Sequence, residues 1–171
     1  LHRTSMNRRL TSLLGLAGGL SVLAVAAFVW MPHADAPIDD LRFHNPRATL
    51  FTFLDCYGVA DLPQKEILRR MEIGRTFHLN DPATRDECFV DYEGPQDEGL
   101  VGYVFGSLAP VKDDLVISGD ERVAHTIASD DAGPTRPVVL HRTDLGWKIH
   151  LRESVPRSVQ RQLEEAAAQA R

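Results

Sequence analysis

Alternating apolar and polar positions predict strands in the second half of the chain. Between residues 114 and 151 the alternation is interrupted by turn residues such as Gly119-Asp120 and Asp144-Leu145-Gly146. Four strands are predicted, at residues 114–118, 122–129, 136–142 and 147–151. Their short connections favour antiparallel hairpins, so the strands form a meander with one packed face and one wetter face.

The alternation also assigns side chains to the two faces of the predicted sheet. In the last strand Trp147, Ile149 and Leu151 fall on the packed face. Lys148 and His150 then fall on the opposite face, toward solvent. In the second strand His125 alternates in step with Val123 and Ile127, which predicts that His125 lies on the packed side.

A helical period replaces the alternation upstream of residue 114. Asn45 followed by Pro46 is typical of an N-cap and the first helical position. An apolar stripe at i, i+3, i+4 and i+7 follows, made by Leu50, Phe53, Leu54 and Tyr57. A first helix is therefore predicted from Pro46 to about Gly58.

Three further helices are predicted before the sheet. The second follows Asp61, buries Ile67, Leu68 and Met71, and ends at Gly74. The third starts at Asp81-Pro82 and carries Cys88, Phe89 and Tyr92 toward Gly94. The fourth spans residues 100–108, although Gly99, Gly102 and Gly106 weaken it by about 1 kcal/mol each relative to alanine.

Helices followed by strands predict an α+β fold for residues 45–154, with the helices packed on one face of a four-stranded antiparallel meander. Residues 155–171 predict a separate C-terminal helix with a thin apolar stripe at Val155, Val159 and Leu163. Such a helix can dock on the domain, pair with a partner, or fray as an exposed tail.

Residues 10–32 contain no charged side chain and are long enough to cross a bilayer as a helix, for which about 20 residues suffice. Residues 1–9 carry Arg3, Arg8 and Arg9, and residues 33–44 form a polar linker that contains Asp35, Asp39 and Asp40. By the positive-inside rule, the basic flank lies in the cytoplasm and the domain lies across the membrane.

Two interpretations of residues 10–32 stay open. One is an uncleaved anchor of a single-pass inner-membrane protein. The other is a signal peptide cleaved after a small-residue site at residues 24–26 or 34–36, which yields a secreted protein. Both place the domain in the periplasm or outside the cell.

Charge excludes one class of partner. Residues 1–36 hold three of the 19 basic and one of the 24 acidic residues, so residues 37–171 carry 16 basic and 23 acidic residues, a net charge of −7. Phosphate contacts by basic side chains supply most non-specific nucleic-acid affinity. We therefore expect no nucleic-acid partner.

The chain has two cysteines, Cys56 and Cys88, on the first and third predicted helices. In an oxidising compartment they are candidates for a disulfide, and closing a loop of this size contributes roughly 3–4 kcal/mol. The alternative is two free, buried thiols that behave as small hydrophobic groups. Neither a C-x-x-C pair nor an activating neighbour indicates a catalytic cysteine.

No catalytic, cofactor or metal motif is evident. His125, His141 and His150 fall on three strands, and three imidazoles can bind zinc, but the alternation places His125 and His150 on opposite faces. The glycines at 99, 102 and 106 match neither a dinucleotide-binding nor a P-loop spacing. We expect no metal site, no cofactor and no catalytic set.

A family resemblance rests on two short segments. Residues 146–149 (Gly-Trp-Lys-Ile) close the meander, and residues 46–54 (Pro-Arg-Ala-Thr-Leu-Phe-Thr-Phe-Leu) open the first helix. Together with the order of elements over residues 45–151, they resemble the nuclear transport factor two-like (cystatin-like cone) superfamily. The resemblance implies a small cone in which a curved sheet wraps a long N-terminal helix.

The resemblance leaves the activity open, because this superfamily includes isomerases, ligand carriers and non-catalytic, membrane-anchored assembly subunits. Two departures stand out. The segment 79–110 is longer and more helical than a minimal member needs, and the Asp/His pattern of the enzymatic branches is missing.

Two functions are therefore weighed. The first is a non-catalytic, membrane-anchored domain that binds another envelope protein or a second copy of itself. The second is a small-ligand binder or an enzyme that uses the cavity of the cone, lined by Tyr103, His125 and Trp147. The shape of that cavity discriminates between the two.

Overall fold

The computed structural model describes residues 39–127 and 137–169. The described residues all belong to one compact unit, Pro37–Arg171. The predicted basic flank, the span 10–32 and residues 128–136 lie outside the described residues. Within the described ranges, no helix is both long and apolar enough to cross a membrane.

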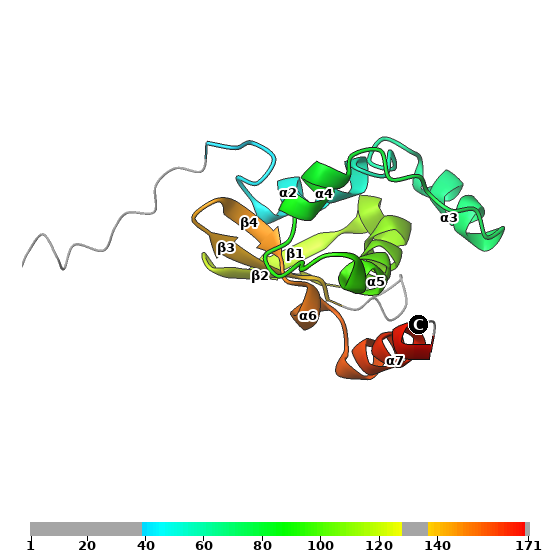
Figure 1. Ribbon diagram of the computed structural model, residues 1–171. Helices are drawn as coiled ribbons and strands as arrows, with labels where there is room; N and C mark the ends of the chain where they lie inside the picture. Colours follow the sequence, from blue (N-terminus) through cyan, green and yellow to red (C-terminus); the bar gives the residue numbers. More distant parts are fainter. Residues whose placement is uncertain (1–38, 128–136, 170–171) are drawn as a thin grey trace, which may run out of the picture. The chain divides into compact units, whose positions relative to one another are not determined.

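A four-stranded antiparallel sheet with the strand order β1-β2-β3-β4 forms the second half of the unit (Figure 1). The strands are β1 (Val116–Gly119), β2 (Val123–Ile127), β3 (Val139–Thr143) and β4 (Gly146–Ile149). Each strand pairs with its sequence neighbours, as in the pairs Ser118–His125, Ala124–Leu140 and Leu140–Ile149. The predicted meander is confirmed.

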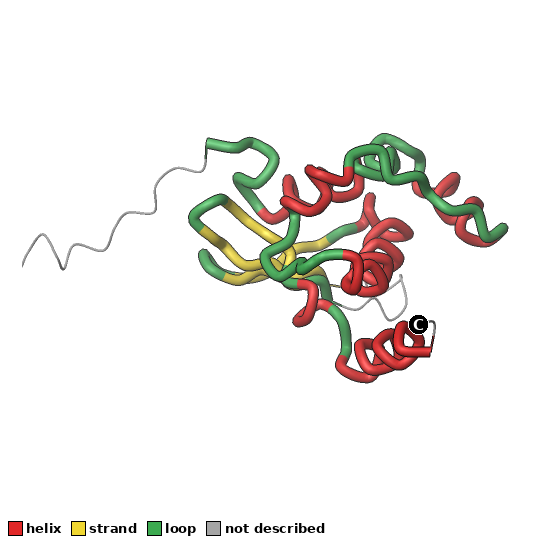
Figure 2. Tube along the Cα trace, in the orientation of Figure 1, coloured by secondary structure: helices red, strands yellow, loops and turns green. Residues whose placement is uncertain are grey.

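Helices alternate with loops in the described residues before the sheet, and two more helices follow it (Figure 2). They are α2 (Pro46–Asp55), α3 (Gln64–Glu72), α4 (Pro82–Glu87), α5 (Glu98–Leu108), α6 (Leu151–Ser154) and α7 (Arg157–Gln169), with 3₁₀ turns η1 (Pro95–Asp97) and η2 (Ala109–Asp114). The architecture is α+β, as predicted. Helix α5 forms despite its glycines, because Leu100, Val101, Val104 and Leu108 bury one side of it.

Helix α2 forms as the sequence predicts. The side chain of Asn45 accepts a hydrogen bond from the backbone N–H of Ala48, which satisfies a donor in the first turn. Leu50, Phe53 and Leu54 are fully buried in the core. The helix packs against β4, where the hydroxyl of Thr49 donates to the carbonyl of Trp147 at 2.8 Å.

The prediction that the third helix carries Cys88, Phe89 and Tyr92 is wrong beyond Glu87, where α4 ends. Asp81 caps the start of this helix as predicted, since its carboxylate accepts from the N–H of Thr84. After Glu87 the backbone pairs with the last strand: the N–H of Ile149 donates to Cys88, and the N–H of Val90 donates to Ile149. Because these backbone N–H and C=O groups pair with β4, they cannot form the hydrogen bonds of a longer helix.

The face assignment of His125 is also wrong. In β2 the buried residues are Ala124 and Thr126, whereas His125 and Ile127 are exposed. Ala124 pairs with Leu140, which pairs with Ile149, so these three small or aliphatic residues define the packed face. Both faces of β2 carry apolar residues, and therefore alternation alone cannot choose between them.

The predicted solvent-facing position of Lys148 is a third correction. Only 7% of Lys148 is exposed. Its ammonium lies 3.1 Å from the centre of the Phe43 ring and donates to the carbonyl of Glu87 at 2.6 Å. The segment before α2 and the end of α4 thus cover this face of β4. Burial lowers the pKa of Lys148.

The last strand ends earlier than predicted. Leu151 does not extend β4 but starts α6, because the carboxylate of Asp91 accepts hydrogen bonds from the N–H groups of Leu151 and Arg152. A carboxylate at this position stabilises the start of a helical turn. The predicted C-terminal helix is present as α7, which begins after Pro156.

Candidate functional site

The side of helix α7 that faces the core carries Val159 and Leu163, four residues apart, as the sequence predicts. Both side chains are only half-buried, and no residue of α7 is fully buried. Leu163 packs on helix α5 at Gly99, where a Cβ atom would lie 3.1 Å from Cδ2 of Leu163. The absence of a side chain at Gly99 therefore allows the two helices to approach closely.

A second attachment holds only the beginning of α7. The side-chain amide of Gln160 donates to the carbonyl groups of Arg152 and Val155, at 2.8 and 2.6 Å. The last turns of the helix, including the alanines at 166–168, are exposed. Helix α7 is thus docked through its first two turns and by few side chains.

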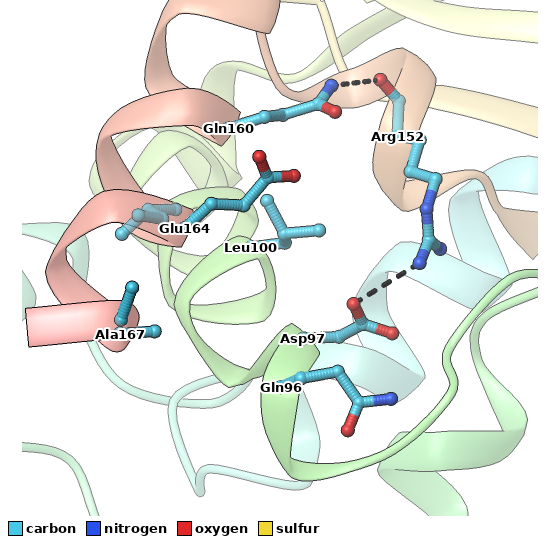
Figure 3. A pocket seen from close by; sticks show the side chains of 9 residues that line it. Gln96, Asp97, Leu100, Arg152, Gln160, Glu164 and Ala167 are labelled. Carbon is cyan, nitrogen blue, oxygen red and sulfur yellow. Dashed lines mark hydrogen bonds and ion pairs between the residues drawn. The ribbon is translucent and has the colours of Figure 1, made fainter. Parts of the chain in front are cut away.

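A cleft of about 300 Å³ opens between α7, α6 and the start of α5 (Figure 3). We call it the α7 cleft. It is lined by Gln96, Asp97, Leu100, Arg152, Gln160, Leu163, Glu164, Ala167 and Ala168. Leu100, Leu163 and the alanines supply an apolar floor, and charged groups stand at the rim.

The charged residues that line the α7 cleft are Asp97, Glu164 and Arg152. Arg152 lies 3.4 Å from a carboxylate oxygen of each of Asp91, Glu93 and Asp97. Only 5% of the Asp97 side chain is exposed, and its other oxygen accepts from the backbone N–H of Glu93 at 2.7 Å. Of the charged residues that line the cleft, Asp97 and Glu164 are acidic and Arg152 is basic, so the lining carries a small negative charge that suits a cationic group.

The three residues predicted to line a cone cavity are not brought together. Trp147 is 7% exposed within the core, Tyr103 is half-buried on α5, and His125 is exposed on the sheet. None of them lines the α7 cleft. The predicted cavity therefore has no counterpart at these positions.

Two of the sheet histidines meet on the face opposite Trp147. The rings of His141 and His150 are 4.9 Å apart. His141 Nε2 lies 2.9 Å from a Glu153 carboxylate oxygen, and His150 Nδ1 lies 3.1 Å from an Asp91 carboxylate oxygen. His150, predicted to face solvent, is thus half-buried in a polar network. One sequence signal could have predicted this pair: His141 and His150 lie on neighbouring strands, at positions whose side chains point to the same face of the sheet.

No group of three or more His, Cys, Asp or Glu side chains in residues 39–127 and 137–169 could hold a metal ion. His150 bonds to Asp91, whose carboxylate also accepts from the first N–H groups of α6, and His141 bonds to Glu153 within α6. The pair therefore has a structural role at the junction of β3, β4 and α6.

The two cysteines occupy the C-terminal ends of α2 and α4. Both are buried free thiols, and each donates to the carbonyl four residues earlier in its own helix, Cys56 to Thr52 and Cys88 to Thr84. The disulfide stays a prediction.

Comparisons with known proteins add nothing to this geometry: no protein-family model matches the chain, and neither a curated protein nor a solved structure matches it. The resemblance to the nuclear transport factor two-like superfamily stays a prediction.

Proposed function

We propose that this chain is a non-catalytic, membrane-anchored, extracytoplasmic α+β domain that binds another envelope protein in the α7 cleft. The observation that carries the proposal is the loose docking of α7: an amphipathic helix that buries no residue fully lies beside an open cleft. A binding partner can readily displace a helix that is held so weakly, or can pack a further helix against it.

The chemistry of the α7 cleft specifies the partner. Its floor of Leu100 and Leu163 favours an apolar side chain, and the exposed carboxylate of Glu164 favours a neighbouring lysine or arginine. A partner helix with an apolar anchor beside a cation meets both requirements. Self-association is the competing occupant, and the experiment below separates the two.

The anchor and the finer features of the fold belong to the same proposal. The charge-free run at residues 10–32, with arginines before it, supports a single inner-membrane span with the domain in the periplasm. The packing of α2 on β4, beside the buried face of the sheet, supports a cone-like domain. Cleavage of the span as a signal peptide is the competing outcome.

Location is tested first, in bacterial cells that express the full chain. We expect the protein in the membrane fraction, resistant to carbonate extraction, and digested by protease only after the outer membrane is opened. Mass analysis of the intact N-terminus separates an anchor from a cleaved signal. A chain that is protected from protease in spheroplasts contradicts the proposal.

Binding is tested with a photo-crosslinking amino acid at Ala167, which lines the α7 cleft, and at Glu72 on α3 as the control position. We expect one discrete, stoichiometric adduct from Ala167 only. A mass equal to two copies of the chain identifies self-association and overturns the choice of partner. Equal adducts from both positions, or none from Ala167, overturn the site.

A matched pair of variants checks that the adduct needs the docked helix. In Gly99→Leu the new side chain takes the space of Leu163, whereas at Gly102, on the same helix, nothing lies within 4 Å of an added Cβ. We expect Gly99→Leu to lose the adduct and Gly102→Leu to keep it.

The alternative function, a small-ligand binder or enzyme in the cone, has no supporting observation in the described residues. Tyr103, His125 and Trp147 lie in three different environments.

A further inference from the structure

Two turns of the domain present a leucine to solvent. Leu41 and Leu145 are each 76% exposed, the highest exposed fraction among the large apolar side chains of the described residues. Turn positions are ordinarily taken by glycine, asparagine, aspartate, serine or proline, whose conformational preferences suit a turn. A leucine in such a place serves neither the turn nor the core. We call residues 40–43 and 143–146 the leucine turns.

Hydrogen bonds hold both leucine turns in shape. Across Leu41, the N–H of Phe43 donates to the carbonyl of Asp40 at 3.0 Å. In the second turn, the hydroxyl of Thr143 accepts from the N–H of Leu145 at 3.2 Å. Each leucine is therefore carried by an ordered backbone and projects from a fixed point of the surface.

The leucine turns lie at the same end of the sheet. The N–H of Trp147 donates to the carbonyl of Phe43 at 2.8 Å, which joins the start of β4 to the first turn. Leu145 is two residues from Trp147, and Leu41 is two residues from Phe43. Because consecutive Cα atoms are about 3.8 Å apart, the two leucines are separated by at most about 20 Å. They can therefore contact one surface together.

The first leucine turn is firmly attached to the rest of the domain. Phe43 is only 2% exposed, and its ring lies over the ammonium of Lys148. The guanidinium of Arg42 lies 2.7 Å from a carboxylate oxygen of Asp40 and 2.9 Å from one of Glu87 in α4. This turn therefore moves with the domain, and a connection to a membrane span starts at Asp40.

The length of that connection limits how the domain can turn toward a bilayer. The proposed span ends at residue 32, so residues 33–39 connect it to Asp40. Such a segment reaches about 25 Å when fully extended. A domain of the size of residues 37–171 has a diameter of roughly 35 Å. Because the connection is shorter than this diameter, the end of the domain with the leucine turns stays nearest the bilayer.

We propose that Leu41 and Leu145 insert into the headgroup–acyl boundary of the bilayer in which the chain is anchored. The contact rests on the proposed function, since the anchor at residues 10–32 supplies the short connection. It removes exposed apolar area from water. The boundary is recognised by its apolar character and not by anionic headgroups, because Arg42 is paired with Asp40 and Glu87.

The test uses the full chain in vesicles of phosphatidylcholine with brominated acyl chains, which quench fluorescence on contact. A fluorescent amino acid that is excited apart from tryptophan replaces Leu145. The control position is Ile73, which is 55% exposed at the end of α3, well away from the leucine turns (Figure 1). We expect emission to fall by about half or more at 145 and by less than about a tenth at 73, since interfacial apolar groups lie about 5–10 Å into the boundary. Equal quenching at both positions overturns the contact.

Two leucine variants check that the turns act together. Leu41→Ser is matched by Leu68→Ser, because Leu68 is also exposed, at 47%, but lies on α3. With the fluorophore at 145, we expect Leu41→Ser to reduce the quenching by about half and Leu68→Ser to leave it unchanged. An equal effect of the two variants overturns the joint contact.

Lipid charge distinguishes apolar insertion from attraction to anionic headgroups. Replacing about a third of the phosphatidylcholine with phosphatidylglycerol should leave the quenching at 145 unchanged, because a paired arginine adds little attraction to an anionic surface. Quenching that appears only with phosphatidylglycerol overturns the role assigned to the leucines.

Carbonate extraction of the same vesicles separates this inference from the proposed function. An anchored chain stays with the vesicles. A chain that resists carbonate but shows no quenching at 145 overturns the leucine contact alone. A chain that is quenched at 145 but extracted by carbonate overturns the anchor and supports the contact. Loss of both signals overturns both.

Discussion

Trp147 joins the last strand to helix α2 through both its side chain and its backbone. The side chain is 7% exposed, its carbonyl accepts from Thr49, and its N–H donates to the carbonyl of Phe43. We expect Trp147→Ala to lower the free energy of unfolding by about 3–5 kcal/mol, because a large buried side chain leaves a cavity. Urea unfolding followed by far-UV circular dichroism measures the change.

Leu145 is the matched control for Trp147, since it lies two residues earlier in the same hairpin but is 76% exposed. Leu145→Ala should change the free energy of unfolding by less than about 0.5 kcal/mol. Equal costs for the two variants contradict the burial of Trp147.

Glu98 links stability to acid pH. Its pKa is lowered, chiefly because buried Arg85 donates a hydrogen bond to its carboxylate, while burial acts in the opposite direction. The folded chain therefore binds fewer protons here than the unfolded chain. The stabilisation is present above the ordinary pKa of about 4.5 and is lost as the pH falls through the lowered folded value.

Below a pH of about 4.5, the stability of Glu98→Gln should therefore fall less with decreasing pH than that of the unsubstituted chain. The side chain is half-exposed, so the effect stays well under about 1 kcal/mol. Glu165→Gln on α7 controls for the change in net charge. Thermal melts from pH 3 to pH 7 show the effect as a difference in slope, and parallel curves for Glu98→Gln and the parent contradict it.

Single residues were predictable where one physical signal dominates. The N-caps Asn45 and Asp81 were predictable because a short polar residue followed by proline is a strong local signal for the start of a helix. His125 and Lys148 were not predictable, since their environments depend on segments far away in the chain. The Phe43 ring and the end of α4, more than 60 residues upstream, cover Lys148.

At the scale of elements, the contact between α5 and α7 makes a prediction that does not depend on the partner. Gly99→Leu should release α7, because the new side chain occupies the position of Leu163, whereas Gly102→Leu projects into open space. Limited trypsin digestion reports the release as faster cleavage at Arg157 and Arg161, by about tenfold or more.

The α7 release should leave the rest of the domain folded, as no fully buried residue belongs to α7. Unchanged digestion in Gly99→Leu, or equally fast digestion in Gly102→Leu, contradicts the packing of Leu163 on Gly99.

Elements were predicted well where they depend on local sequence and poorly where they end against another element. The meander and the starts of α2 and α4 follow from alternation, turns and caps. The end of α4 and the start of α6 depend on pairing with Ile149 and on capping by Asp91. Both are contacts between segments about 60 residues apart, which no local pattern records.

At the scale of the whole molecule, the α7 cleft was the feature that the sequence predicted least. Its lining comes from η1, α5, α6 and α7, and only Leu163 belongs to a stripe that the sequence predicted. The predicted cone cavity failed for the same reason: it needed His125 and Trp147 on one face, and the register of the sheet separates them.

The distribution of buried residues predicts how the domain opens. Fully buried residues are concentrated in α2, α5, β3 and β4, including Leu50, Val104, Leu140 and Ile149, whereas α7 contains none. Amide hydrogens in β3 and β4 should therefore exchange only on global unfolding, and those in α7 by local opening.

Hydrogen exchange on the full chain and on Trp147→Ala separates the two modes of opening. Loss of the buried ring should accelerate exchange in β3 and β4 by about a hundredfold or more, in proportion to the lost stability, and leave α7 unchanged. If α7 instead accelerates together with the strands, it unfolds with the core as one cooperative unit. The cleft would then be a fixed part of the domain, and a partner could not use a movable α7.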